Sequence, residues 1–296
     1  MNIYTSQDIC VLTPTKDRPH KIENLLESLV NQTEKVGRII IIVSGQNIES
    51  IIEPYLPRLP IEYYYSEIAG QIRQRKLGIS KLDNQTKLVA TLDDDIILDN
   101  DSISNLLKYW NSKDENTVGI GFNITNMSKH EYSKIKEFFF LSSIQPGQVL
   151  SSGYPTSIVN VDQSIPTKWL NGGATVWKQE ELIEGIHKKT IDSSWAPCED
   201  LMFSYPIGKI KSLWVCKDAK VFHDDNVKYH SIDSAIERGR TLSKWTLDFV
   251  IQNPELNRFH FYISTISSSV FNMMRKVFTM NFFFELGRIS YLVNKK

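Results

Sequence analysis

The first part of the chain alternates short apolar runs with segments of helical periodicity. Pro14 is expected to end the first run and Pro19 to begin the first helix, because proline suits the first turn of a helix. The predicted strands are 9–13, 38–45, 61–67 and 87–95, and the predicted helices between them are 19–31, 48–56 and 71–82. Strands joined through helices form right-handed crossovers. The pattern therefore predicts an α/β fold with a Rossmann-like, mostly parallel central sheet flanked by helices.

Beyond about residue 119 the alternation loosens, and we expect a mixed sheet there. Residues 212–223 predict two short strands around Lys217 and Asp218, and the pattern is mostly helical from Ser231 onward. Further extended pieces are expected at 118–122, 148–151, 157–161, Trp169 and 174–177, with helices near 178–184 and 199–205. This interpretation gives a main domain of residues 1–225 and a helical C-terminal extension of residues 226–296.

Charge and cysteine usage narrow the class of protein. The chain has 34 basic and 34 acidic residues, so its overall charge does not favour a nucleic-acid partner. An odd number of cysteines at unrelated spacings is typical of reduced packing residues in a cytoplasmic protein; they are Cys10, Cys198 and Cys216. The N-terminus lacks the pattern of a secretory signal, and charges interrupt the apolar stretch 259–284. We therefore expect no membrane-spanning segment.

Three consecutive aspartates follow the apolar run LVATL. Asp93, Asp94 and Asp95 would repel one another at the mouth of a buried strand unless a cation were bound. Mg²⁺ and Mn²⁺ prefer such oxygen ligands and share them with substrate phosphates. In a continuing strand, Asp93 and Asp95 point to the same side. The alternative is capping of the next helix, but that needs one aspartate, and Asp99 or Asp101 suits it.

Five segments, in this order and spacing, resemble the family 2 glycosyltransferases of the GT-A fold. VLTPTKDRP resembles the family's first strand and donor loop, GQIRQRKLGI its arginine-containing helix, and TLDDDIIL its DXD motif. NGGATVWKQEEL resembles the acceptor-side segment, and APCEDLMFSY the acidic pair that supplies the catalytic base. The resemblance covers about residues 8–225. It implies a nucleotide-binding half at about 1–118, an acceptor half at 119–225, and transfer of a sugar to an acceptor hydroxyl with inversion.

The resemblance also implies which residues bind the nucleotide-sugar donor. Ser44 stands where family members commonly carry an aspartate that recognises the nucleotide base. The identity of the donor's base is therefore left open, and a UDP-sugar is favoured. Taken alone, PTKDRP is as readily a turn and helix start, and Arg73 belongs to a solvated helix face. The implied donor-binding set is Thr13, Pro14, Thr15, Asp17, Ser44, Gln71, Arg75, Asp93 and Asp94.

The acceptor-side and catalytic residues follow from the same resemblance. Asp200 would take the proton from the acceptor hydroxyl, with Glu199 supporting it or binding the acceptor. From the residues alone, an acidic pair placed favourably at a helix N-terminus is the stronger reading. Trp169, Gly172 and Gly173 would lie near the donor sugar and acceptor, although a plain strand-linking turn would use the same glycines.

Mg²⁺ or Mn²⁺ is the implied cofactor. Its ligands would be Asp95 and His223, with Asp93 as a further ligand or as the residue that orients the ribose. An isolated histidine at a strand end is otherwise a packing or surface residue, and Asp224 and Asp225 beside it are expected to be solvated.

The C-terminal residues and the family context suggest which partners the protein has. Much of the aromatic content of the C-terminal residues is expected to be core. The mixture of Phe, Met and basic residues in FNMMRKVFTMNFFFELGR is also compatible with a helix lying on a membrane or packed on another chain, including a second copy, but membrane contact is the less favoured reading. We expect the acceptor to be a carbohydrate or a lipid-linked molecule. We expect the protein to act in the cytoplasm or at the inner face of the cell membrane, as bacterial surface glycan synthesis requires.

Two other classes of protein fit the sequence less well. A nucleotidyltransferase usually has a glycine-rich phosphate loop after its first strand, and TPTKDRPHK is not such a loop. A binding module without catalysis is disfavoured by the intact Asp93, Asp95 and Asp200.

Overall fold

The protein consists of two compact units in a computed structural model that describes residues 3–187, 197–224, 231–276 and 279–293. The first unit comprises Met1–Lys129, Ile158–Trp195 and Pro206–Asp225, and the second comprises His130–Ser157, Ala196–Tyr205 and Asn226–Lys296. Segments from within 1–225 therefore group with the C-terminal residues. Two residues named from the sequence, Ala196 and Asp225, lie outside the described residues.

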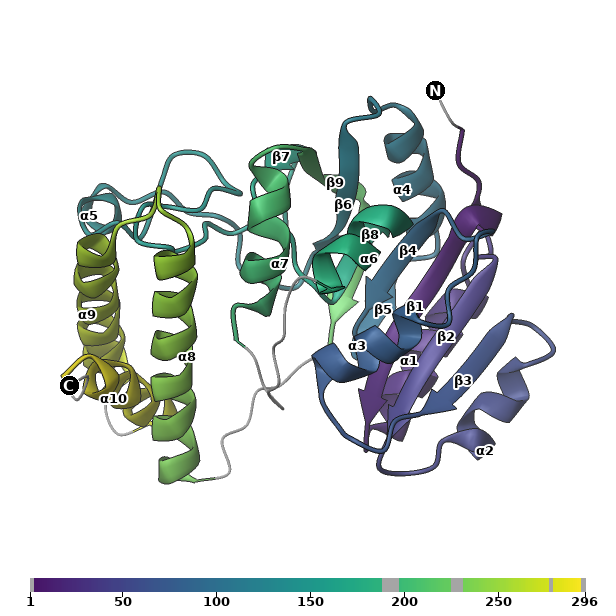
Figure 1. The fold of residues 1–296 in the computed structure, drawn as a ribbon, viewed down its shortest axis with the longest axis horizontal. Coiled ribbons are helices and arrows are strands. Elements are labelled where there is room, and N and C mark those ends of the chain that lie inside the picture. Colours follow the sequence, from purple (N-terminus) through teal and green to yellow (C-terminus); the bar gives the residue numbers. More distant parts are fainter. Residues whose placement is uncertain (1–2, 188–196, 225–230, 277–278, 294–296) are drawn as a thin grey trace. The chain divides into compact units, whose positions relative to one another are not determined.

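A nine-stranded sheet forms the first unit (Figure 1). The strand order is β3-β2-β1-β4-β8-β6-β9-β5, with β7 paired to β9. Neighbours among β1 to β4 are parallel, β8 is antiparallel to β4 and β6, and β6 is parallel to β9. The predicted fold and its mixed second half are thus confirmed. The strands are β1 Ile9–Lys16, β2 Arg38–Ser44, β3 Ile61–Tyr65, β4 Leu88–Leu92, β5 Ile96–Leu98, β6 Thr117–Ile124, β7 Ile165–Thr167, β8 Ala174–Lys178 and β9 Ser212–His223.

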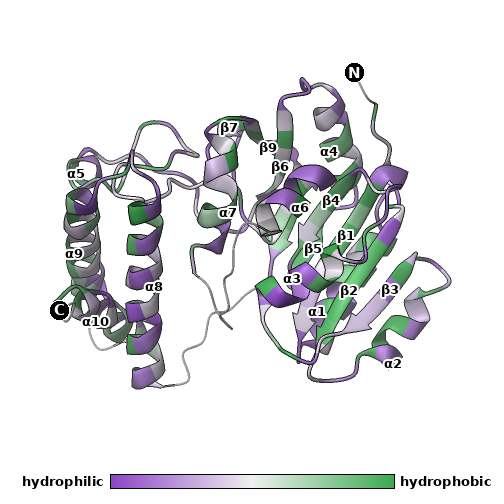
Figure 2. Ribbon diagram, viewed as in Figure 1, coloured by the Kyte–Doolittle hydropathy of each residue, from purple (hydrophilic) through white to green (hydrophobic). Residues whose placement is uncertain are grey.

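Helices cover both faces of the sheet because its central strands are apolar on both sides (Figure 2). On one face, α1 and α4 pack with alternate residues of β1, β2 and β4 in a single core. On the other, Gly78 of α3 lies against Leu12 and Ile42. A fully buried isoleucine in β2 contributes roughly 2–3 kcal/mol. The elements are η1 Ser6–Asp8, α1 Pro19–Val30, α2 Glu49–Ile52, η2 Glu53–Tyr55, α3 Gln71–Ile79, α4 Ser102–Asn111 and α6 Gln179–His187.

Several expected strand boundaries are wrong. Strand β1 continues through Pro14 to Lys16. Its pairing with β4 ends at Leu12, so beyond that residue one edge of β1 is unpaired, and the missing N–H of Pro14 is tolerated there. Residues 212–223 form one strand, β9, whose register on β6 jumps from Cys216 to Lys220 in an irregularity. Strand β4 ends at Leu92, so the aspartates follow it in a turn.

The extended pieces expected at 148–151, 157–161 and Trp169 are not strands. Among the described residues of this stretch, an isolated bridge between Val149 and Pro155 is the only strand-like pairing. Positive φ angles at Gly153 (80°) and Asn160 (50°) turn the backbone instead.

The second unit is mainly helical, as the pattern from Ser231 onward predicted. Its helices are α5 Lys134–Phe138, the first part of α7 Glu199–Gly208, α8 Ile232–Gln252, α9 Arg258–Arg275 and α10 Met280–Val293. Among the described residues, none of the helices combines the length and apolar character needed to cross a bilayer.

The three cysteines are free thiols. Cys10 and Cys216 are buried, and burial raises the pKa of Cys10 to about 12. Burial likewise raises the pKa of Cys198, to about 11, and its sulfur lies 3.4 Å from the Thr246 hydroxyl. The prediction of reduced packing residues is consistent with these positions.

Two glycines allow α8 and α10 to approach closely. A Cβ atom on Gly239 would lie 2.0 Å from the Phe284 carbonyl oxygen, and one on Gly287 would lie 2.0 Å from the Ile236 carbonyl oxygen. In an isolated helix, alanine is favoured over glycine by about 1 kcal/mol. Here we expect Gly239→Ala to lower the free energy of unfolding by about 1–3 kcal/mol, because backbone must move. Urea denaturation measures this, and a stabilised variant would contradict the close helix contact.

Candidate active site

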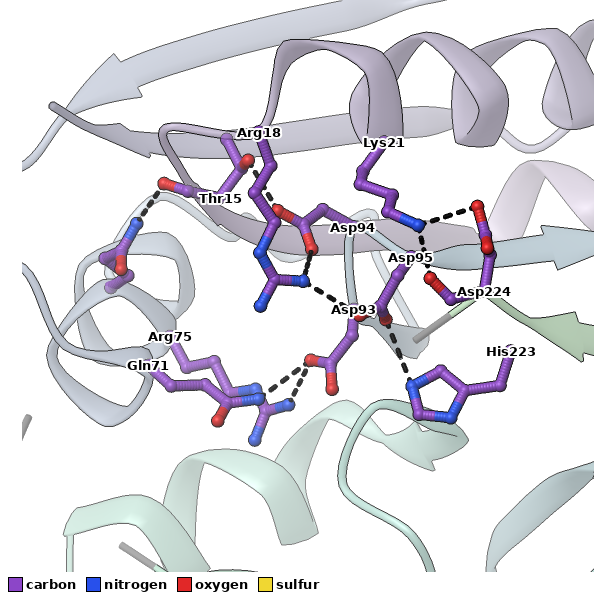
Figure 3. Close-up of polar contacts among 11 residues, drawn as sticks. Thr15, Arg18, Lys21, Gln71, Arg75, Asp93, Asp94, Asp95, His223 and Asp224 are labelled. Atoms are coloured by element: carbon purple, nitrogen blue, oxygen red, sulfur yellow. Dashed lines mark hydrogen bonds and ion pairs between the residues drawn. The ribbon is translucent and has the colours of Figure 1, made fainter. Parts of the chain in front are cut away.

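The aspartate triplet lies in a turn at the carboxyl end of β4, where β1 also ends (Figure 3). The Ile96 N–H donates to the Asp93 carbonyl oxygen at 3.2 Å and closes this turn between β4 and β5. Because the residues turn, the three carboxylates do not alternate as in a strand, and each reaches different partners. The expectation that strand geometry aligns Asp93 with Asp95 is therefore wrong.

Asp93 faces α3. Its Oδ1 accepts hydrogen bonds from Gln71 Nε2 and Arg75 Nη2, both at 2.8 Å (Figure 3). Arg75 is buried, so this ion pair is shielded from solvent on the arginine side. The backbone of Gly173 is equally close: its carbonyl accepts from the Asp93 N–H at 2.9 Å, and a Cβ there would lie 2.0 Å from Asp93 Oδ2. Predicted donor-side and acceptor-side residues thus meet at Asp93.

Asp94 is buried between β1 and the start of α1. Its Oδ2 accepts from the Thr15 hydroxyl at 2.7 Å, and its Oδ1 accepts from Arg18 Nη1 at 3.0 Å. Burial raises the pKa of Asp94 to about 6; the negative charges of Asp95 and Asp93 add to the rise, while Thr15 and Arg18 oppose it. Asp94 therefore holds its proton more tightly in the folded protein than in the unfolded chain.

Asp95 shares Arg18 with Asp94 and also faces the end of β9. Arg18 Nη1 lies 2.8 Å from Asp95 Oδ2, and His223 Nε2 lies 3.3 Å from Asp95 Oδ1. Burial opposes ionisation of Asp95, but the contact with His223 and the charge of Arg18 outweigh it and lower the pKa. Asn126 fixes His223 by bonding both its backbone N–H and its carbonyl.

A second ion pair closes the same edge. Lys21 Nζ lies 2.6 Å from Asp224 Oδ2 and also donates to the Asp224 carbonyl. The Asp224 N–H donates to the Asp95 carbonyl oxygen at 2.8 Å. Asp224, expected to be solvated, is therefore paired with Lys21, while about a third of its side chain (34%) stays exposed.

The predicted nucleotide wall lies on β1 and β2. Thr13, Pro14 and Thr15 are buried, and the buried hydroxyls of Thr13 and Ser44 make no hydrogen bond with the described residues. Asp17, at a φ of 54°, accepts from the Gln46 N–H at 2.8 Å and so ties the two loops together. Their contact with a nucleotide stays a prediction.

Glu199 and Asp200 begin α7 in the second unit, within its first turn. The Ser204 hydroxyl donates to the Asp200 carbonyl oxygen at 2.5 Å. Trp169 and Gly172, half-buried, lie in the first unit between β7 and β8. The catalytic and acceptor roles of these residues stay predictions.

Comparison with known proteins assigns the family. Residues 10–165, more than half of the chain, match the model described as "Glycosyl transferase family 2". The chain belongs to this family. A search of the curated proteins found no match for this glycosyltransferase.

Solved structures share the fold of this glycosyltransferase. The mannosyltransferase PcManGT from Pyrobaculum calidifontis, in complex with GDP-Man and Mn²⁺, superposes with a TM-score of 0.60 at 12% identity, over 98% of this chain and 88% of that one. S. aureus TarS 1–349 in complex with UDP-GlcNAc gives 0.59 at 14% identity, over 96% and 79%. At such low identity the likeness establishes the fold alone.

The residues present fit a divalent metal that is shared with a substrate. Asp95 is buried beside the His223 imidazole, and Arg18 lies as a cation between Asp94 and Asp95. The described residues of this glycosyltransferase include no group of three or more acidic, histidine or cysteine side chains arranged to hold an ion. Mg²⁺ typically takes only one or two carboxylates and completes its shell with phosphates and water.

Sequence reasoning missed three residues of this site. The sequence pattern indicates Arg18 only as part of a turn and helix start, and it indicates no role for Lys21 or Gln74. Gln74 is buried and donates to the carbonyls of Thr15 and Ile42, both at 2.8 Å. Their partners are 32 to 203 residues away in the chain. Arg18 and Lys21 flank Pro19 at the start of α1, directly after the strand whose end forms the site, and that position was the available signal.

Asp94→Asn is expected to change the pH dependence of stability. The folded pKa of about 6 lies above the unfolded value, so the wild type loses stability as pH rises from about 4 to about 6. The amide cannot ionise, so the variant should gain stability relative to the wild type across that window. Urea unfolding in EDTA at several pH values measures the difference. A difference that does not vary with pH would contradict the assignment.

Proposed function

We propose that this glycosyltransferase moves a sugar from a nucleotide-diphosphate sugar to an acceptor hydroxyl with inversion of the anomeric carbon. The observation that carries the proposal is the cation position between Asp94 and Asp95, occupied by Arg18 at the mouth of β4. A site that holds a guanidinium between two carboxylates suits a divalent ion and the phosphates that come with it. Membership of family 2 and the nucleotide sugars named for PcManGT and TarS support the donor class.

In this proposal each carboxylate has its own task. Asp95 and His223 hold Mg²⁺ or Mn²⁺, which when bound supplies neutralisation of the diphosphate charge. Asp93, held by Gln71 and Arg75, orients the donor ribose. Arg18 pairs with Asp94 and Asp95, and in this proposal its half-exposed guanidinium exchanges those contacts for the diphosphate.

Asp200 is the proposed base. Its carboxylate takes the proton of the acceptor hydroxyl while the oxygen bonds to the anomeric carbon and the bond from that carbon to the diphosphate breaks. Because the attack comes from the face opposite the leaving group, one displacement inverts the carbon. Glu199 supports the base or binds the acceptor. The acceptor is a carbohydrate or a lipid-linked sugar, in keeping with bacterial surface glycan synthesis.

Calorimetric titration with UDP-, GDP-, dTDP- and CMP-sugars, with and without Mn²⁺, tests the donor site. We expect one donor to bind, with an affinity at least about tenfold higher in Mn²⁺. His223→Ala should remove the Mn²⁺ effect, whereas His20→Ala, at an exposed position on α1, should retain it. If no donor binds under either condition, the proposed function is wrong.

A further inference from the structure

Helix α9 exposes an apolar stripe. Phe259, Ile266, Val270 and Met274 have exposed fractions of 68%, 46%, 41% and 74%. At 3.6 residues per turn these positions fall within roughly 80° of one another around the helix axis. They therefore form one continuous face along α9, which we call the α9 stripe.

The α9 stripe is on the side where a water-soluble helix normally carries polar residues. The buried side of α9 holds one aromatic residue, Phe261, and otherwise small hydroxyl residues, with Ser264, Thr265 and Ser269 at 4% exposure or less. The Ser269 hydroxyl donates to the buried carboxylate of Glu285 on α10 at 2.7 Å. Helices that contact lipid commonly place small and polar residues against neighbouring helices and turn their apolar residues outward.

Neighbouring aromatic residues widen this surface. Phe139 packs edge-on against Phe271 of α9, with ring centroids 5.7 Å apart, and against Phe138, with centroids 5.1 Å apart. Phe138 on α5 is 76% exposed, and Ile135 is 67% exposed. Lys134 and Lys136 alternate with these apolar residues on α5, beside one acidic residue, Glu137, which accepts from the Tyr132 hydroxyl.

Basic residues outnumber acidic ones on α9 and α10. Although the whole chain is balanced, residues 257–296 carry six basic residues and a single acidic one, Glu285. That carboxylate is 5% exposed and is engaged by Arg288 Nη1 at 2.9 Å and Asn272 Nδ2 at 2.8 Å. Helix α9 itself has no acidic residue, and Arg258 and Arg275 stand at its two ends.

We propose that the α9 stripe and the exposed residues of α5 bind the surface of an anionic lipid bilayer, with α9 lying in the interface. Apolar side chains enter the boundary between head groups and acyl chains, and the basic residues meet the anionic head groups. No described helix can span the bilayer, so the contact is peripheral. This inference does not depend on the proposed function, because it uses no residue of the donor site.

Co-sedimentation of the full chain with vesicles tests the proposal. We expect binding to phosphatidylcholine mixed with phosphatidylglycerol, weaker binding to phosphatidylcholine alone, and weaker binding at high salt. Ile266→Gln/Val270→Gln/Met274→Gln should weaken partitioning by about tenfold or more. The matched control is Leu56→Gln/Ile210→Gln, which removes exposed apolar side chains from the first unit and should bind like the wild type.

A second pair of variants separates charge from hydrophobicity. Arg275→Gln/Lys276→Gln should reduce the preference for phosphatidylglycerol, whereas Lys217→Gln/Lys220→Gln, at exposed positions of β9, should not. Absence of wild-type binding to phosphatidylglycerol vesicles would overturn the proposal. Self-association in sedimentation equilibrium without vesicles, abolished by the triple variant, would also overturn it by assigning the surface to a second copy of the chain.

Discussion

Asp95→Ala is expected to lower metal-dependent turnover of the donor by about a thousandfold or more. Asp95 is one of the two protein groups proposed to hold the ion, and charge stabilisation by a bound metal is worth several kcal/mol, roughly that factor in rate. Asp95 also contacts Arg18 and His223. Steady-state nucleotide release with varied Mn²⁺ measures both the rate and the apparent affinity for the metal.

Two comparisons make the Asp95 result specific. Asp99→Asn changes an exposed aspartate just after β5 and should leave turnover within about twofold, since exposed substitutions have small effects. Asp95→Asn keeps the shape of the side chain and should be nearly as inactive as the alanine variant. Full activity of folded Asp95→Asn, as judged by circular dichroism, would contradict the role of Asp95 in metal binding.

Asp200→Asn is expected to lower kcat by about 10²–10⁴-fold, the range for removing a general base. Donor binding should be unchanged, because the proposed base acts on the acceptor and not on the nucleotide sugar. The amide retains the size of the side chain but cannot accept the proton. Measuring kcat together with donor affinity therefore separates catalysis from binding.

The simpler role of Asp200, in stabilising a helix start, has its own control. Asp233 is an exposed acidic residue in the first turn of α8, so Asp233→Asn removes the same kind of helix-dipole interaction. It should leave kcat unchanged. If both variants lose a little stability and neither loses activity, Asp200 serves only the helix.

Much of the fold follows from local pattern. Apolar runs such as RIIIIVS of β2, followed by helical periodicity, identify the strands of the parallel half and the helices on its faces. The boundaries depend on pairing, which a local pattern does not contain. Pro14 stays inside β1 because β4 has already ended its pairing at Leu12, and residues 148–161 turn because Gly153 and Asn160 take positive φ angles.

The sequence predicted many of the residues that form the site, but not which of them contact one another. The order of motifs pointed to Asp93, Asp94, Asp95, Arg75 and His223, and the structure brings these residues to one edge of the sheet. Which carboxylate meets which cation depends on the turn after Leu92, so the pairing of Arg18 with Asp94 and Asp95 could not be read from spacing.

The roles of the two acidic residues that begin α7 could not be inferred from local pattern. Glu199 and Asp200 are separated from the aspartate turn by about a hundred residues, and in sequence they are indistinguishable from ordinary acids at a helix start. Their assignment depends on the resemblance to the family, which is why a kinetic test is needed.

The most direct test of the central claim is a measurement of nucleotide release from the donor that binds in the calorimetric titrations. The wild type is incubated with this donor and an acceptor-containing membrane extract, once in Mn²⁺ and once in EDTA. The account predicts release in Mn²⁺ that EDTA abolishes and that Asp95→Ala lacks. Release at an equal rate in EDTA, or from Asp95→Ala in Mn²⁺, would contradict a metal-dependent glycosyl transfer at the aspartate turn.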